Sequence, residues 1–326
     1  MKLQNLLIGI LFGTGILLGP SVAFAKLDLV SITTNPQTPG PNEDVTVSVQ
    51  SYVTNLNAAK IIWYVDKEPI KEGIGEKTFQ TRTKSIGQSV VIEVVIIGTN
   101  GEQYNKKLVL TPIEVDMLWE ADTYVPPFYK GKALPTYKSI VKVTAIPRFN
   151  SLTSDPANYY YKWTVNRTQG VGEGLGHNSA PIGVGWPNSS IPVTVDVSLA
   201  ASGGSGSATT FLPITDPTIL FYEQAPLLGA LFAHALKGSV TAEGNEYKIR
   251  AVPYFFSNDD LNGGQIVYSW RKNAQPVASE SNPDLFTLGK DSKAAQATTI
   301  SLFAQNRKRV LQQANEHVIV NFLEEN

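Results

Sequence analysis

The chain has 326 residues, of which 42% are hydrophobic and 17% charged, a globular composition with enough length for two or three hydrophobic cores. Its formal net charge is only −1, so it has no strong field to attract nucleic acid or anionic lipid, and nucleic acid is excluded as an expected partner. Cysteine is absent, which excludes disulfides, thiolate metal sites and cysteine nucleophiles.

The first 25 residues have the pattern of a signal peptide. Lys2 provides a positive start, an apolar run covers residues 6–18, Pro20 interrupts it, and residues 23–25 read Ala-Phe-Ala. We therefore expect cleavage after Ala25 and export, to the medium or the cell surface, or to the periplasm if the source has an outer membrane. The alternative is an uncleaved anchor, which would be the only contact with a membrane.

Three strand-like stretches, at residues 61–66, 159–166 and 266–273, repeat at intervals of roughly 100 residues, the size of one β-sandwich domain. Apolar residues alternate in each, and each carries a tryptophan on the apolar side: Trp63, Trp163 and Trp270. A second repeated pattern, apolar and aromatic residues ending in glutamate, covers 115–120 and 218–223. These repeats predict an all-β chain with three domains, at residues 26–113, 114–214 and 215–326, whose cores contain the tryptophans.

Three further segments carry local predictions. Asn100-Gly101 predicts a hairpin between strands at 89–97 and 107–110. Residues 201–210, with a Gly-Gly-Ser-Gly-Ser centre, predict a flexible hairpin loop. Leucines and alanines at i, i+4 and i+8 between Pro226 and Lys237, followed by Gly238, predict a short helix, and residues 126–134 predict a weaker one.

Three units of this length, each with a strand-borne tryptophan and frequent turn signals, resemble bacterial immunoglobulin-like or PKD-like repeats of secreted surface proteins. The resemblance covers nearly all of the chain after residue 25. It implies three tandem immunoglobulin-like β-sandwiches that serve display, spacing or adhesion at a cell surface, without catalysis. The disulfide of many such domains is missing, and no Trp-x-Phe-Gly-Asp-Gly run occurs.

Aromatic residues outside the strand pattern are the candidate binding residues. Phe128 and Tyr129 lie beside two lysines, and Trp186 lies in a Gly-Trp-Pro-Asn segment. An aromatic ring with polar neighbours can stack on a sugar or anchor a protein contact, so the expected partner is a surface protein or a glycan. The simpler alternative is that these rings plug the sandwich ends or the seam between domains.

No catalytic residues and no cofactor are predicted. The loop 257–264 gathers oxygen-bearing side chains, including Asp259, Asp260 and Asn262, but lacks the calcium-loop register, so a solvated turn is preferred over a Ca²⁺ site. The three histidines, His177, His234 and His317, are not at metal-ligand spacing. Two other functions stay open: an accessory part of a pilus or secretion apparatus, and a carbohydrate-active hydrolase with its site between domains 2 and 3.

Overall fold

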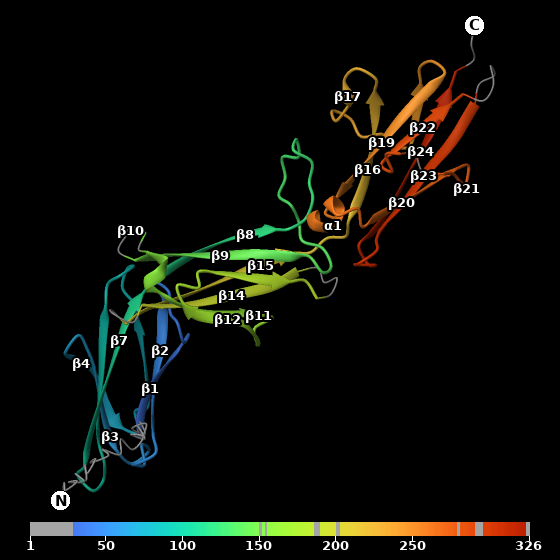
Figure 1. Ribbon diagram of the computed structural model, residues 1–326. Coiled ribbons are helices and arrows are strands. Elements are labelled where there is room, and N and C mark those ends of the chain that lie inside the picture. The colour runs from blue at the N-terminus through green and yellow to red at the C-terminus, as the bar shows by residue number, and fades with distance from the viewer. Residues whose placement is uncertain are drawn as a thin grey trace, which may run out of the picture.

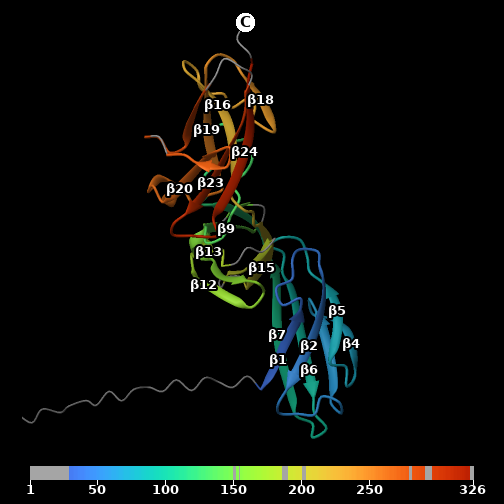
Figure 2. The ribbon, with the colours of Figure 1, turned by 90° about the vertical axis from the view of Figure 1, so that its right-hand side faces the viewer.

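The computed structural model is nearly all β and places three β-sandwiches one after another along an extended, bent body (Figures 1 and 2). It describes residues 29–149, 152–153, 155–185, 190–199, 203–278, 281–290 and 296–323. The predicted signal peptide lies outside the described residues. Within the described part of the chain, no helix is long and apolar enough to cross a membrane.

The first sandwich packs a three-stranded sheet, β1-β2-β5, against a four-stranded sheet, β4-β3-β6-β7. Alternate valines and isoleucines of β2 and β6 point inward because successive strand residues face opposite sides of a sheet, and they surround Trp63. The β6–β7 hairpin turns at 98–101, as Asn100-Gly101 predicts. Its strands are β1 (Val30–Asn35), β2 (Asp44–Ser51), β3 (Lys60–Val65), β4 (Glu68–Ile74), β5 (Thr78–Arg82), β6 (Val90–Ile97) and β7 (Gln103–Pro112).

The second sandwich repeats this topology. One sheet contains β8, β9, β10 and β13, the other has the order β12-β11-β14-β15, and the core between them includes Trp163. The elements are β8 (Glu114–Ala121), β9 (Ile140–Phe149), β10 (Leu152–Thr153), a 3-10 turn (Pro156–Asn158), β11 (Tyr160–Val165), β12 (Gln169–Leu175), β13 (Ser179–Gly183), β14 (Ser190–Leu199) and β15 (Gly204–Pro213).

The third sandwich follows the same plan with two additions. Its sheets are β17-β16-β19-β22 and β18-β24-β23-β20-β21, and its core includes Trp270. Short strands β17 and β18 extend one edge of each sheet. The elements are β16 (Thr218–Ala225), β17 (Gly229–Ala230), β18 (Ser239–Ala242), β19 (Glu246–Tyr254), α1 (Asn258–Asn262), β20 (Ile266–Lys272), β21 (Gln275–Pro276), β22 (Leu285–Gly289), β23 (Gln296–Asn306) and β24 (Gln313–Phe322).

Each core tryptophan is held in the same way. Trp63, Trp163 and Trp270 are at most 1% exposed, and each indole N–H donates to a backbone carbonyl 13 or 14 residues later. The N–O distances are 2.8 Å to Glu76, 2.8 Å to His177 and 2.9 Å to Pro283. A buried indole N–H needs such a partner, since leaving it unpaired costs about 1–3 kcal/mol.

A second shared device follows each tryptophan strand. Two consecutive residues with positive φ form the hairpin turn after β3, β11 and β20: Asp66-Lys67, Asn166-Arg167 and Asn273-Ala274. This backbone matches the right-handed twist of a two-residue hairpin, where aspartate and asparagine tolerate positive φ. The first turn residue also donates its N–H to the neighbouring strand at 2.8, 3.0 and 2.8 Å.

The helix predicted over Pro226–Lys237 is wrong. Residues 224–225 pair instead with β17 across a tight turn at Gly229 (φ +78°), and Leu236 donates its N–H to Phe221 at 2.7 Å. The backbone groups of this segment that bond to β16 are therefore not available for helical hydrogen bonds. Leu227 and Leu228 are 96% and 80% exposed, so the apolar spacing does not build a buried helical face. Residues 126–134 likewise form turns and loop rather than a helix.

The flexible loop predicted over 201–210 is also wrong for residues 204–210. They form the start of β15, which pairs in parallel with the end of β7 through Gly204–Thr111 and Ser205–Pro112. Ile113 donates its N–H to Ser205 at 2.8 Å, and a Cβ at Gly206 would lie 2.1 Å from the Ile113 carbonyl oxygen. Glycine is therefore required by the close approach of two backbones. This contact joins two four-stranded sheets into one of eight strands.

A tyrosine in the second core predicts alkaline sensitivity. Burial raises the pKa of Tyr161 to about 12. Because the folded-state pKa lies above the ordinary value near 10, the unfolded chain loses its proton first, so stability falls as pH rises from about 10 to about 12. We expect Tyr161→Phe to flatten this decline in urea unfolding measured between pH 9 and 12. Tyr52→Phe, at an 83% exposed position, is the control and should leave the decline unchanged.

Candidate functional site

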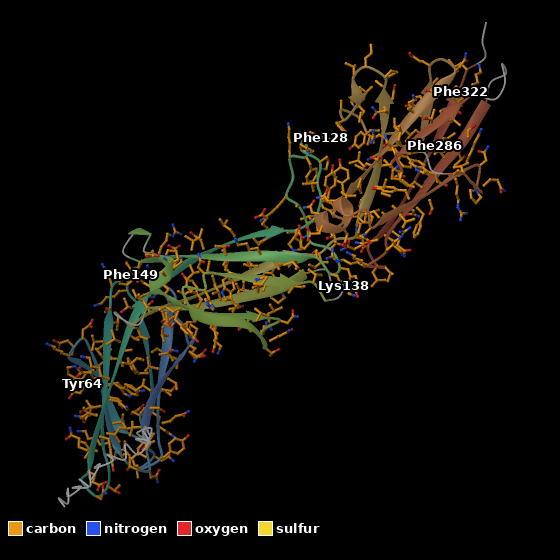
Figure 3. All side chains as sticks on the ribbon, viewed as in Figure 1. Tyr64, Phe128, Lys138, Phe149, Phe286 and Phe322 are labelled. Carbon is orange, nitrogen blue, oxygen red and sulfur yellow. The ribbon has the colours of Figure 1, made fainter. Side chains whose placement is uncertain are left out.

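The loop between β8 and β9, residues 122–139, reaches from the second sandwich to the third, and Figure 3 shows Phe128 on it near the third sandwich. Tyr124 bonds in both directions with the two residues that follow β19, donating its N–H to the Phe256 carbonyl and accepting from the Phe255 N–H, each at 2.7 Å. Thr123 and Ser257 form an additional β-bridge. The loop is therefore bonded through its backbone to the third sandwich, which fixes its aromatic residues against that surface.

Those aromatic residues cover the outward side of β16 and β19. Tyr222, Val252 and Tyr254 are buried there beneath Tyr124 and Tyr129 of the loop. The hydroxyls of Tyr222 and Tyr254 lie 2.9 Å apart, and the rings of Tyr129 and Tyr254 meet edge to face at 5.6 Å. Burial, followed by the bond to Tyr222, raises the pKa of Tyr254. The cluster thus buries aromatic rings and bonds its two buried hydroxyls to each other.

Beside the cluster is an open groove of about 390 Å³, formed by residues from both sandwiches. One wall is Phe128, 38% exposed, whose ring stacks on Phe232 at 3.9 Å. Arg250 and Asp284 also line it, with Nη1 and Oδ2 2.7 Å apart, and Arg250 Nε donates to Gln224 at 3.2 Å. Aromatic rings beside a half-exposed ion pair can bind a ligand that has both apolar and polar surfaces.

A buried polar network lies on the other side of this junction. Gln312, fully buried, donates its side-chain amide to the Tyr137 carbonyl at 2.7 Å and accepts from Asn306 at 3.0 Å. Asn306 in turn donates to Asp260 at 2.7 Å. Arg309 pairs with the same Asp260 oxygen at 2.8 Å. The Gln312–Tyr137 bond crosses between the two sandwiches, and together with the bonds of Tyr124 it joins the loop to the third sandwich.

The structure brings together only part of the predicted site. Phe128 and Tyr129 both lie at the junction between the second and third sandwiches. Tyr129 packs against Tyr254, and Phe128 lines the groove. Trp186 lies outside the described residues. Asp259, Asp260 and Asn262 form α1 rather than an open loop, and the Asp260 carboxylate already binds Arg309 and Asn306. No group of three His, Cys, Asp or Glu side chains placed to hold a metal occurs among the residues described.

Sequence reasoning missed the polar part of the junction. Asp260, Asn306 and Gln312 are buried polar residues, and Gln312 bonds to a carbonyl 175 positions away, so strand periodicity gives no signal for them. Arg250 and Asp284 pair across two strands and are equally hidden. The positive-φ turn residues, in contrast, could have been found from the sequence. Asp66, Asn166 and Asn273 each come three positions after a core tryptophan.

Comparison with known proteins gives fold-level similarity and no family. No protein-family model matches the chain, and no curated protein matches its sequence. The chain resembles immunoglobulin-like repeat proteins in its fold. Similar structures include three N-terminal domains of the bacteriophage RB49 highly immunogenic outer capsid protein, with 13% identity, TM-score 0.27, and 91% of this chain and 98% of that chain covered.

Two other structures show the same level of similarity. Fibronectin(III)-like modules of Clostridium thermocellum CbhA match with 10% identity, TM-score 0.28, and 56% and 93% of the two chains covered. A 1.5-MDa bacterial ice-binding adhesin matches with 10% identity, TM-score 0.25, and 91% and 98% covered. The assignment to this fold rests on the strand order and the tryptophan on the third main strand of each sandwich.

Proposed function

We propose that the chain is an exported, non-catalytic immunoglobulin-like repeat protein that acts as a stiff spacer and presents a binding surface away from the cell. One observation carries this proposal: both junctions contain direct backbone hydrogen bonds. β7 meets β15 at the first junction, and the 122–139 loop meets β19 at the second. Domains connected by a plain linker would move independently, whereas these contacts favour one extended body.

The groove at the second junction gives the spacer a binding surface. Its residues come from two sandwiches, so its shape depends on the rigid junction. Phe128 and Phe232 offer exposed aromatic faces next to Arg250 and Asp284, which suits a surface protein or a glycan. A role at the cell surface agrees with the signal-peptide pattern in residues 1–25.

Small-angle scattering on residues 26–326 tests the spacer proposal. Three sandwiches in a row, each with a radius of gyration near 13 Å and centres roughly 30–38 Å apart, should give about 28–34 Å for the whole chain. A single compact globule of that length should give about 19 Å. A value near 19 Å, or a scattering curve of freely jointed domains, would contradict the proposal.

A further inference from the structure

The outward face of β20, β23 and β24 in the third sandwich is hollowed and polar. A shallow depression of about 810 Å³ crosses these three strands. The strand register places its side chains in two rows, each with one residue from every strand: Ser269, Phe303 and Asn315, and then Arg271, Ser301 and His317.

The polar side chains of this face have unused hydrogen-bonding capacity. In the part of the chain that the structure describes, the side chains of Ser269, Arg271, Ser301 and Asn315 make no hydrogen bond or ion pair. Phe303, 40% exposed, lies at the centre of its row, between Ser269 and Asn315. A flat aromatic ring surrounded by hydroxyl, amide and guanidinium groups is suited to a sugar, whose C–H face packs on the ring while its hydroxyls bond at the edges.

The charge of the face favours an anionic ligand. No acidic residue occupies an outward position in the described part of the three strands, whereas Arg271 and His317 do. The carboxylate that lines the depression, Glu316, accepts the backbone N–H of His317 at 2.8 Å and lies 3.9 Å from His317 Nδ1, so the positive charge offered to a ligand is that of Arg271. An unpaired guanidinium has the fork geometry that binds a carboxylate through two parallel hydrogen bonds.

The corresponding outward face of the second sandwich, formed by β11, β14 and β15, carries different side-chain interactions. There Thr194 and Thr209 bond to each other through their hydroxyls at 2.8 Å, and Lys162 lies directly across from Asp196. Facing positions on that sheet thus include a hydrogen-bonded threonine pair and two residues of opposite charge. The exposed set in the third sandwich, with Arg271 unpaired among the described residues, is therefore a local feature and not a consequence of the fold.

We propose that the outward face of β20, β23 and β24 binds an acidic polysaccharide, a chain of sugars that carry carboxylate groups. Phe303 stacks on one sugar ring, Arg271 pairs with a carboxylate, and Ser269, Ser301 and Asn315 bond to hydroxyls. This inference goes beyond the spacer role and does not depend on it, because all of its residues belong to one sandwich.

Calorimetric titration of residues 26–326 with polygalacturonate tests the proposal, and fully methyl-esterified polygalacturonate is the uncharged match. We expect binding to the acidic chain, weakened at least tenfold by methyl esterification and weakened by added salt. Phe303→Ala and Arg271→Gln should each weaken binding about tenfold or more. Both positions are exposed, so the melting temperature should stay unchanged.

Two variants elsewhere serve as matched controls. Phe211→Ala removes a 61% exposed phenylalanine from β15 of the second sandwich, and Arg167→Gln removes an exposed arginine from the β11–β12 turn. Both should bind like the unchanged protein. The proposal is overturned by absence of binding to polygalacturonate and to alginate alike, by equal binding of the methyl ester, or by full binding of the Phe303 variant. Self-association abolished by Phe303→Ala, without polysaccharide binding, would assign the face to a second copy instead.

Discussion

Trp163→Ala is expected to destabilise the second sandwich by about 3–5 kcal/mol, the usual cost of removing a large aromatic side chain from a core. The indole is 1% exposed within the second core cluster, and its N–H bonds to the His177 carbonyl at 2.8 Å. The substitution therefore leaves a cavity and removes the hydrogen bond to the His177 carbonyl. Differential scanning calorimetry should show the transition of the second sandwich moving to lower temperature.

The three separate core clusters make this effect local. Trp63 and Trp270 lie in different clusters, so the transitions of the first and third sandwiches should move much less. Tyr160→Ala is the matched control, since it removes an aromatic ring that is 41% exposed on the same strand. An equal shift of every transition after Trp163→Ala would mean one shared core and would refute three independent sandwiches.

Gly206→Ala is expected to open the junction between the first and second sandwiches. The added Cβ would lie 2.1 Å from the Ile113 carbonyl oxygen, a backbone atom that cannot rotate away. The Ile113–Ser205 hydrogen bond and the parallel β7–β15 pairing must then separate. The expected cost is about 1–3 kcal/mol, with little change in either core.

Because the chain has no cysteine, two introduced cysteines can be labelled specifically to measure whether this junction opens. Spin labels on Gln80→Cys and Lys162→Cys, both exposed, report the distance between the first and second sandwiches without competing thiols. We expect a narrow distance distribution in the otherwise unchanged chain and a broad one after Gly206→Ala. Gly183→Ala, where a Cβ meets no atom within 4 Å, should keep it narrow. A narrow distribution in both variants would show that the glycine contact does not fix the junction.

Strand periodicity and the spacing of the tryptophans predicted the features that depend on residues close together in the chain, namely the strands and their buried faces. Alternation in residues 61–66, 159–166 and 266–273 gave the third main strand of each sandwich, because a half-buried strand must alternate. The apolar spacing at 227–236 misled for a physical reason: Leu227 and Leu228 point into solvent, and the backbone is engaged by β16. Helical spacing predicts a helix only where a surface exists to bury its apolar face.

The candidate site was only half predictable for a related reason. The sequence shows that residues 128 and 129 are aromatic. It does not show that Tyr129 packs against Tyr254 while Phe128 lines the groove, because this depends on how the third sandwich contacts the loop. Gly206 reads as part of a flexible glycine-serine segment until the Ile113 backbone is placed against it. Contacts between residues about 90 positions apart are set by the assembled fold rather than by neighbours in the chain.

The parallel pairing of β7 with β15 also sets an order of events during synthesis. A chain that emerges N-terminus first completes the first sandwich at Pro112, but the partner of its last residues is the final strand of the second, beginning at Gly204. Until that strand arrives, the Ile113 N–H lacks its partner Ser205, whereas the Pro112 carbonyl already accepts from Gly87 within the first sandwich. An unpaired group at a sheet end can recruit the wrong strand. A chaperone that covers this end, or a translation pause after Pro213, would act at the moment when the first two domains become one body.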